Sequence, residues 1–509
     1  MKKAVCALIC VILCFSVACC GGETEREKTP SGESKVRLKS EKISLLYYSG
    51  DSFNPYTAKT KYNREISRLI YDPLIKCDNN FKPSYCLAES AVISGNVCTV
   101  TLRSANWSDN TPVTAQDVVY SYKAALKSET IYASQLYEVA SVSADGNRVI
   151  FNLKQVDPYF LNLLDFPIIK SESDGRKDSD GVDIAPIGSG RYYISDDKQT
   201  LLRNNAYFGT VGEVSEITLI NAPDEISASH YVEVGAADIY YADESVENIA
   251  RMSGKRADVN TNNLVYIGIN GAYGPLGTNY IRYAVSAAID RTTICHSAYF
   301  DNATPASGYF NPVIKETSAV QSLKTSADLQ ISVENLGKIG YNVLDNGYYC
   351  NASGKHLTFT LLVNSDNPSR VAAANLIASQ CRAAGIEIKV TQRGYNEYLA
   401  ALGSGNFQLY LGEIRVLANM DLSNLVLPGG SAAYGVVSAE GANVCTQMAE
   451  SYKKGGCSLA DLAGAFLTEM PQIPVCYRKG MLFYTSRITD EAVPSCSDIF
   501  FSFENYKFE

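Results

Sequence analysis

The chain has 509 residues, 45 lysines and arginines against 54 aspartates and glutamates, and a formal net charge of −9. This acidic balance argues against nucleic acid as a partner, because binding to nucleic acid requires a basic surface. One hydrophobic core rarely grows beyond about 250–300 residues, so the length predicts at least two lobes.

The first residues have the pattern of an export signal. Residues 1–3 carry positive charge, residues 4–18 form an uncharged apolar run, and two cysteines follow at once. The run is shorter than the roughly 20 apolar residues that span a bilayer, and small residues before a cysteine resemble the lipobox of bacterial lipoproteins. We therefore expect a lipoprotein signal peptide over 1–18 and lipidation of Cys19, with Cys20 as the alternative. Residues 19–42 are polar and predict a flexible tether.

The first half of the remaining chain is rich in predicted strands. Alternating or continuous apolar residues predict strands at 43–48, 97–102, 149–153 and 216–220. One helix is predicted among them, over 114–127. Thr114 is a suitable N-cap for this helix, and Asp117 stands three residues later, where a capping box carries its acid.

The later half alternates strands with helices. Residues 357–363 predict a strand, and Asn367 precedes a helix that ends at Gly385. A strand at 386–391, a helix at 395–402 and a strand at 407–411 follow. This alternation predicts an α/β fold with a mainly parallel sheet. In such sheets ligands bind beyond the carboxyl ends of the strands, a position that Asn364 and residues 412–415 occupy.

Motifs for catalysis and for metal binding are missing from the sequence. There is no G-x-S-x-G, P-loop or H-E-x-x-H motif, and His230, His296 and His356 stand far apart. We therefore expect no enzymatic activity, no cofactor and no metal site. Ten cysteines follow Cys20 without a C-x-x-C pair; an exported chain permits disulfides between them, and the irregular spacing equally suits buried free thiols.

Several segments together resemble one protein family. Residues 107–121, WSDNTPVTAQDVVYS, are similar to the W-S-D-G-x-P-V-T-A-x-D-V-V-F-S segment of family 5 extracellular solute-binding proteins, the peptide and nickel receptors of ABC importers. Further similar segments follow in the family's order, at 53–55, 70–74, 186–192, 203–207, 266–270, 282–291 and 471–477. The resemblance covers nearly all of the chain after the tether.

The resemblance implies a two-lobed fold of the periplasmic-binding-protein type II class, in the peptide-receptor subclass, whose lobes close on a ligand about a hinge. Lobe 1 would comprise 43–262 and 480–509, with an inserted subdomain at about 75–185, and lobe 2 would comprise 263–479.

The implied function is capture of an oligopeptide or similar solute outside the cell, at the outer face of the cytoplasmic membrane, and delivery to an ABC permease. We expect a monomer held to the membrane by its lipid. A nickel chelate or a sugar as cargo, a surface peptide sensor and a surface hydrolase are the alternatives.

The expected ligand site departs from the family in one place. Peptide receptors of the family carry a glycine and a tryptophan followed by a D-Y-x-D-P loop, whose first aspartate pairs with the peptide α-ammonium. Here residues 412–422 read GEIRVLANMDL, so that aspartate aligns with Ala418 and only the second acid remains. A buried ammonium needs a paired acid. The expected ligand-binding residues are Glu413, Arg415, Asp421, Asn270, Asn364, Tyr48 and Asp51.

Other roles are open for four of these side chains. Glu413 and Asp421 are the two candidates for the ammonium partner. A solvated loop or an internal ion pair is the alternative for Glu413, Arg415 and Asp421, and bracing of the hinge is the alternative for Asn270.

Overall fold

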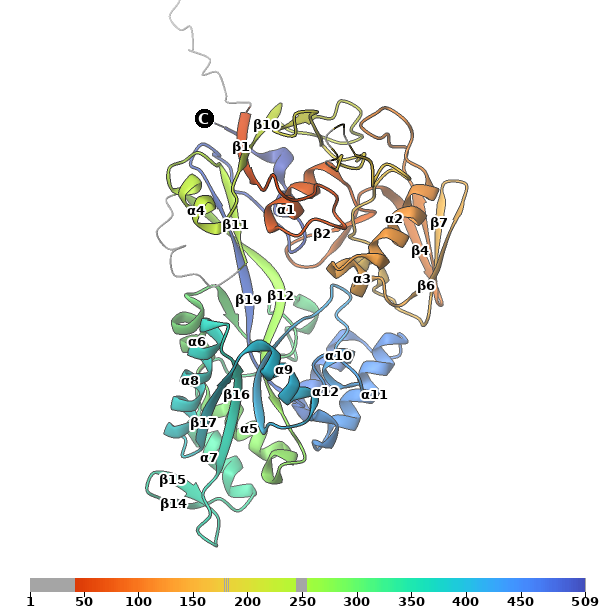
Figure 1. Cartoon of the computed structure of the whole chain (residues 1–509). Coiled ribbons are helices and arrows are strands. Elements are labelled where there is room, and N and C mark those ends of the chain that lie inside the picture. Colours follow the sequence, from red (N-terminus) through yellow and green to blue (C-terminus); the bar gives the residue numbers. More distant parts are fainter. Residues whose placement is uncertain (1–41, 178, 180, 182, 244–253, 509) are drawn as a thin grey trace, which may run out of the picture. The chain divides into compact units, whose positions relative to one another are not determined.

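The computed structural model describes residues 42–177, 179, 181, 183–243 and 254–508 (Figure 1). The predicted signal peptide, the predicted tether up to residue 41, and both candidate lipidation sites, Cys19 and Cys20, lie outside the described residues. Over the part of the chain that is described, no helix combines the length and the apolar character needed to cross a membrane.

One large mixed sheet organises the fold. Its strands follow the order β17-β16-β18-β12-β19-β11-β1-β10-β9-β8, and β13 pairs with β19. The strands are β1 (Lys42–Tyr47), β8 (Tyr192–Ile194), β9 (Thr200–Arg203), β10 (Glu216–Asn221), β11 (Ile239–Ala242), β12 (Lys255–Ile269), β13 (Ala303–Pro305), β16 (Thr358–Asn364), β17 (Glu387–Arg393), β18 (Leu409–Arg415) and β19 (Ile473–Tyr484).

A four-stranded antiparallel sheet and two strand pairs complete the β-structure. The sheet has the order β4 (Ala88–Ser94), β5 (Val97–Leu102), β7 (Arg148–Leu153), β6 (Val139–Asp145). The pairs are β2 (Ile75–Cys77) with β3 (Pro83–Tyr85), and β14 (Val343–Asp345) with β15 (Tyr348–Cys350).

The helices lie between the strands in sequence. They are α1 (Lys61–Ile70), α2 (Ala115–Lys127), α3 (Ile131–Gln135), α4 (Glu225–Glu233), α5 (Asn279–Ala288), α6 (Arg291–Tyr299), α7 (Leu329–Lys338), α8 (Pro368–Ala383), α9 (Tyr395–Gly403), α10 (Ser423–Val426), α11 (Ala442–Lys453) and α12 (Leu459–Glu469). Every helix and strand predicted from the sequence is present, with bounds that differ by a few residues.

The prediction of a mainly parallel sheet is wrong for the sheet as a whole. β16 is parallel to both β17 and β18, as the alternation of strands and helices predicts. However, β12 is antiparallel to β18 and β19, and β19 is antiparallel to β11. These pairings join segments that are far apart in the chain, and the local periodicity of a sequence does not encode them.

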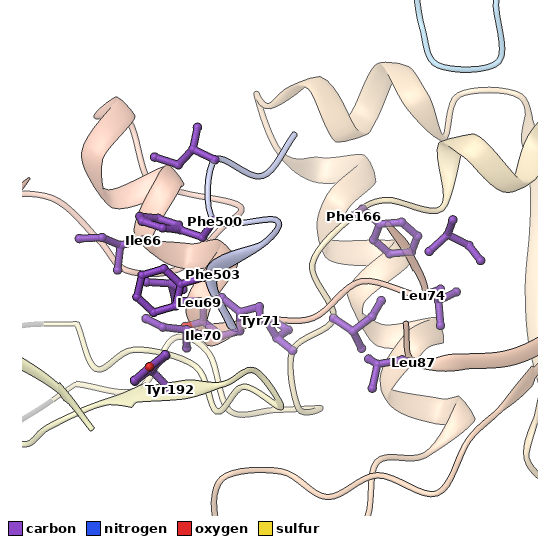
Figure 2. Close-up of a cluster of buried hydrophobic side chains, with 14 of the residues drawn as sticks. Ile66, Leu69, Ile70, Tyr71, Leu74, Leu87, Phe166, Tyr192, Phe500 and Phe503 are labelled. Atoms are coloured by element: carbon purple, nitrogen blue, oxygen red, sulfur yellow. The ribbon is translucent and has the colours of Figure 1, made fainter. Parts of the chain in front are cut away.

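The hydrophobic cores have different sequence origins. The largest combines residues between 43 and 259 with residues between 482 and 508. Figure 2 shows how the C-terminal segment enters it, with Phe500 and Phe503 lying against Ile66 and Leu69 of α1. Two further cores come mainly from residues 264–477; Phe81 joins one of them, and Cys496 packs against it. The lobe boundaries proposed from the resemblance remain predictions.

The predicted capping box at the start of α2 is present. Asp117 Oδ2 accepts hydrogen bonds from Thr114 N (2.9 Å) and from Thr114 Oγ1 (2.7 Å), and Asp117 Oδ1 accepts one from Ser171 N (2.8 Å). The acid therefore fixes both the first turn of α2 and the segment that passes beside it.

We expect Thr114→Ala to lower the free energy of unfolding by about 1 kcal/mol, because the N-cap hydroxyl is lost. Urea unfolding measures this change. Thr114→Ser keeps the hydroxyl and serves as the control, with a change of a few tenths of a kcal/mol at most. Equal losses in the two variants would contradict a role for the hydroxyl.

The cysteines of the described residues are free thiols, and most are buried. Burial raises the pKa of the Cys381 thiol to about 12 and that of Cys496 to about 11. Of the two alternatives left open by the spacing, the structure therefore shows the unpaired thiols.

Candidate ligand-binding site

Two cavities share part of their walls. The first, here called the charged cavity, has a volume of about 250 Å³, and the second, the tyrosine cavity, has a volume of about 460 Å³. Ile131, Arg415 and Leu417 line both. A solute that extends past these three side chains can therefore occupy both cavities.

Helix α1 supplies one wall of the charged cavity. Lys61, Arg64, Glu65 and Arg68 all line it, and their spacing places them on one face of the helix. The apolar residues of α1 point the other way, into the core of Figure 2. The helix is thus amphipathic, with a charged side chain on each turn that faces the cavity.

The loop before α1 holds the start of the helix, and it contains Tyr48 and Asp51. The Asp51 carboxylate accepts hydrogen bonds from Lys59 N (2.9 Å) and Thr60 N (2.7 Å), and Asn63 Oδ1 accepts one from Tyr48 N (2.8 Å). Burial alone raises the pKa of Asp51, and hydrogen bonds from Thr60, Lys59 and Ser52 outweigh that effect and lower it. Neither Tyr48 nor Asp51 lines either cavity, so their position supports α1 instead.

Two of the four charged side chains of α1 are neutralised. Arg68 forms a buried ion pair with Asp165 (2.8 Å), and Lys61 pairs with Glu225 (3.0 Å). Among the described residues, Arg64 and Glu65 have no ion-pair partner. Burial raises the pKa of the Glu65 carboxyl to about 7, although Arg68 opposes the shift.

Arg415 is the predicted residue that both cavities share. It ends β18 and its guanidinium is exposed. The one hydrogen bond of the guanidinium to another described residue runs from Nη2 to the carbonyl oxygen of Cys496 (3.4 Å), and no described carboxylate pairs with it. Arg415 is therefore available to an anionic or carbonyl group of a ligand.

Glu413 lines the tyrosine cavity but is already paired on both oxygens. Arg370 Nη2 lies 2.6 Å from its Oε2, Arg478 Nη2 lies 2.8 Å from its Oε1, and Asn263 Nδ2 also donates to Oε1 (2.9 Å). Burial alone raises the pKa of Glu413, and Arg478 and Arg370 outweigh it, so the pKa lies below its usual value. This geometry favours an internal role rather than the predicted role of ammonium partner.

Asp421, Asn270 and Asn364 line neither cavity. Asp421 Oδ1 accepts a hydrogen bond from Ser423 N (2.8 Å) at the start of α10, and Lys453 Nζ lies 3.7 Å from Oδ2. Asn364 Oδ1 accepts a hydrogen bond from Asp366 N (3.1 Å) in its own turn.

Asn270 braces the segment before β18. Its Nδ2 donates to the carbonyl oxygens of Gly405 (3.1 Å) and Phe407 (3.2 Å), and its Oδ1 accepts from Ala272 N (3.2 Å). These contacts are distinct from the β12 bulge at Asn260–Asn263, so the role of Asn270 at the hinge or in ligand binding stays a prediction.

Tyrosines form an aromatic wall of the tyrosine cavity that was not predicted from the sequence. Tyr266 and Tyr410 line the tyrosine cavity, and their hydroxyl oxygens are 3.2 Å apart. Each ring lies over a glycine of the paired strand, since Tyr266 faces Gly412 and Tyr410 faces Gly268. A Cβ atom at Gly412 would lie 2.7 Å from the Tyr266 ring. The two Y-x-G segments, 266–268 and 410–412, are the sequence pattern from which this wall could have been predicted.

Ala418 stands where the family's ammonium-binding aspartate aligns. It lines the charged cavity, and its carbonyl oxygen accepts a hydrogen bond from Asn162 Nδ2 (2.9 Å). The position therefore faces the cavity as the resemblance implies, but it brings no charge. Any acid for a ligand cation must come from another wall.

Several known proteins are similar to this chain. Protein XP55 of Streptomyces lividans is 26% identical over 345 residues, which are 65% of this chain and 63% of that protein. The periplasmic murein peptide-binding protein MppA of Escherichia coli K12 is 23% identical over 445 residues, 80% of each chain. The crystal structure of a nickel ABC transporter protein from Bacillus halodurans matches with a TM-score of 0.75 at 20% identity, over 90% of this chain and 98% of that one.

The likeness to solved structures confirms the predicted two-lobed, periplasmic-binding-protein-like α/β fold. The family model described as "Bacterial extracellular solute-binding proteins, family 5 Middle" matches residues 82–427, which is more than half of the chain. The match includes the 107–121 segment, α3, β12 and β18. The chain therefore belongs to family 5 of the bacterial extracellular solute-binding proteins.

Proposed function

We propose that this chain is the substrate-binding lipoprotein of an ABC importer and that it captures an oligopeptide or peptide-like solute for delivery to the permease. The observation that carries the cargo class is the joined pair of cavities, one with unpaired charges and one walled by tyrosines. A peptide presents charged ends, polar backbone and bulky side chains together, and it matches both walls. Binding in such a site makes and breaks no covalent bond.

We propose that the hinge lies in β12 and β19, the two strands that join the proposed lobes. β12 carries a bulge between Asn260 and Asn263, and Asn262 adopts a positive φ of 57°. Asn262 Nδ2 donates to the carbonyl oxygen of Val416 (2.9 Å), next to Arg415. A rotation about this bulge changes the distance between α1 and the end of β18, and so closes the charged cavity on a ligand.

We also propose that the receptor is a monomer, anchored at the outer face of the cytoplasmic membrane by a lipid on Cys19, with Cys20 as the alternative. A nickel chelate as cargo has less support, because none of the three histidines lines either cavity. Among the described residues no cluster of three or more metal-ligating side chains occurs.

Native mass spectrometry of the full chain, purified in mild detergent, tests this proposal. We expect the protein to retain peptides from a tryptic digest of casein, because the closed cavities exclude water and release a ligand slowly. The mass of the mature chain reports the lipidation and separates Cys19 from Cys20. A protein that binds no component of the digest, but takes up nickel–histidine or a disaccharide, would overturn the peptide class.

A further inference from the structure

We propose that Glu65 binds the ammonium group of the ligand in the charged cavity, while Arg415 binds a carboxylate or carbonyl group of the same ligand. This inference rests on the proposed peptide-binding function and identifies the acid that takes the place of the residue missing at position 418. It makes this receptor selective for ligands that carry a free ammonium group.

The other acids near the cavity are less suited to this role. Asp165 is held by Arg68 (2.8 Å) and also accepts a hydrogen bond from Ser497. Glu413 is held by two arginines. Asp243 lines the cavity but is exposed to solvent, where its charge is screened by water.

Glu65 combines exposure to the cavity with the absence of an internal partner. It lines the cavity from α1 and is partly buried. Among the described residues, no hydrogen bond or ion pair reaches its carboxylate. Removing a carboxylate from water without a counter-ion is costly. A ligand cation is what this position lacks.

The charges around Glu65 explain its protonation. Burial raises its pKa to about 7, Asp498 and Asp243 add to the shift, and Arg68 and Arg64 on the same helix oppose it. Tyr132 of α3 and Tyr241 of β11 also face it, and Lys61 lies one turn away on the cavity face. The ligand-free site therefore holds a carboxyl group that is partly neutral at pH 7.

A bound ammonium favours the ionised form of Glu65 and lowers its pKa, so binding releases a proton near neutral pH. A group with a pKa of about 7 is partly protonated at pH 7, so a fraction of a proton is released for each ligand bound. Affinity then rises as the pH increases through 7, because less proton has to be released. Glu65→Gln removes both effects.

The deciding experiment compares the wild type, Glu65→Gln and Glu89→Gln, all as full chains, with the tryptic casein digest at pH 7, where the peptide α-amino groups are mostly protonated. Glu89 is an exposed residue of β4 outside both cavities, so it controls for the chemical change alone. We expect Glu65→Gln to weaken binding of the retained peptides by about 10- to 100-fold, which is the range for loss of a charged hydrogen bond. We expect Glu89→Gln to bind as the wild type does.

A second arm uses the digest after acetylation, either of the α-amino groups or of the lysine side chains. If the wild type loses binding to one acetylated digest, the acetylated group is the ammonium that Glu65 binds. Unchanged binding of both acetylated digests would overturn the inference. Equal binding by Glu65→Gln and the wild type would overturn it too, while leaving peptide capture intact. Failure of the wild type to bind any component overturns the proposed function itself.

Circular dichroism checks that each variant is folded, and calorimetric titration measures the proton release. Glu65→Asp, which retains a shorter acid, provides a second variant if Glu65→Gln loses its fold. Titration of a retained peptide in two buffers of different ionisation enthalpy measures the proton release, which a residue with a merely structural role would not change. A wild-type release of zero at pH 7 would contradict the assignment.

Discussion

Arg415→Ala is expected to weaken peptide binding by about 10- to 100-fold, while the free energy of unfolding changes by less than about 0.5 kcal/mol. The guanidinium lines both cavities, is exposed, and makes one long hydrogen bond to a carbonyl oxygen. Its removal therefore costs the folded protein little. In the closed, ligand-bound state the same group would face a ligand acceptor with little water nearby, where a charged hydrogen bond is strong.

Arg393→Ala is the matched control for this variant. Arg393 ends β17, just as Arg415 ends β18, but it lies outside both cavities. Titration calorimetry with a retained peptide should show normal affinity for Arg393→Ala, and Arg415→Lys should recover part of the loss, because it keeps the charge without the planar fork. Normal affinity in Arg415→Ala would remove this residue from the site.

Glu413→Ala is expected to lower the free energy of unfolding by about 3 kcal/mol, because it leaves two arginines without their shared carboxylate. The Glu413 side chain is 7% exposed, and those of Arg370 and Arg478 are 18% and 16% exposed. Urea unfolding at neutral pH measures the change. Glu387→Ala, which removes an acid paired with Lys389 at 3.5 Å near the surface of β17, should cost about 0.5 kcal/mol or less.

The pH dependence of stability gives a second test of Glu413. The pKa of Glu413 in the folded state lies below its usual value because of Arg478 and Arg370, so the stabilisation is present at neutral pH and is lost as the pH falls through the lowered pKa. Glu413→Gln should flatten this acid limb. If Glu413→Ala instead leaves stability unchanged and abolishes peptide binding, the ammonium-partner role predicted from the sequence is correct and the internal role is wrong.

Local structure was predictable because its determinants are close together in the chain. For α8, Asn367 accepts a hydrogen bond from Arg370 N (2.9 Å) at the start, and Gly385 adopts a φ of 74° just after the end. Both contacts span only a few residues. The pairing of β12 with β18 and β19 depends on segments far apart in sequence, and for that reason the mixed character of the sheet was not predicted.

The proposed site was predictable only where it coincides with the end of a strand. Arg415 follows from the rule that ligands bind beyond the carboxyl ends of strands. Glu65 does not, because its helix precedes β18 by several hundred residues and its role depends on which neighbouring acids are already paired. The ion pairs of Glu413 could not be predicted for the same reason, since Arg370 and Arg478 come from two other elements.

The division of the cores implies an order of folding. The cores built from residues 264–477 come almost wholly from one continuous segment, so they can close without the two ends of the chain. The largest core begins near Ile43 and is incomplete until Phe500, Phe503 and Phe508 are added at the other end. The apolar strands at the start of the chain therefore lack their final neighbours until the last residues join them, so this core is completed last.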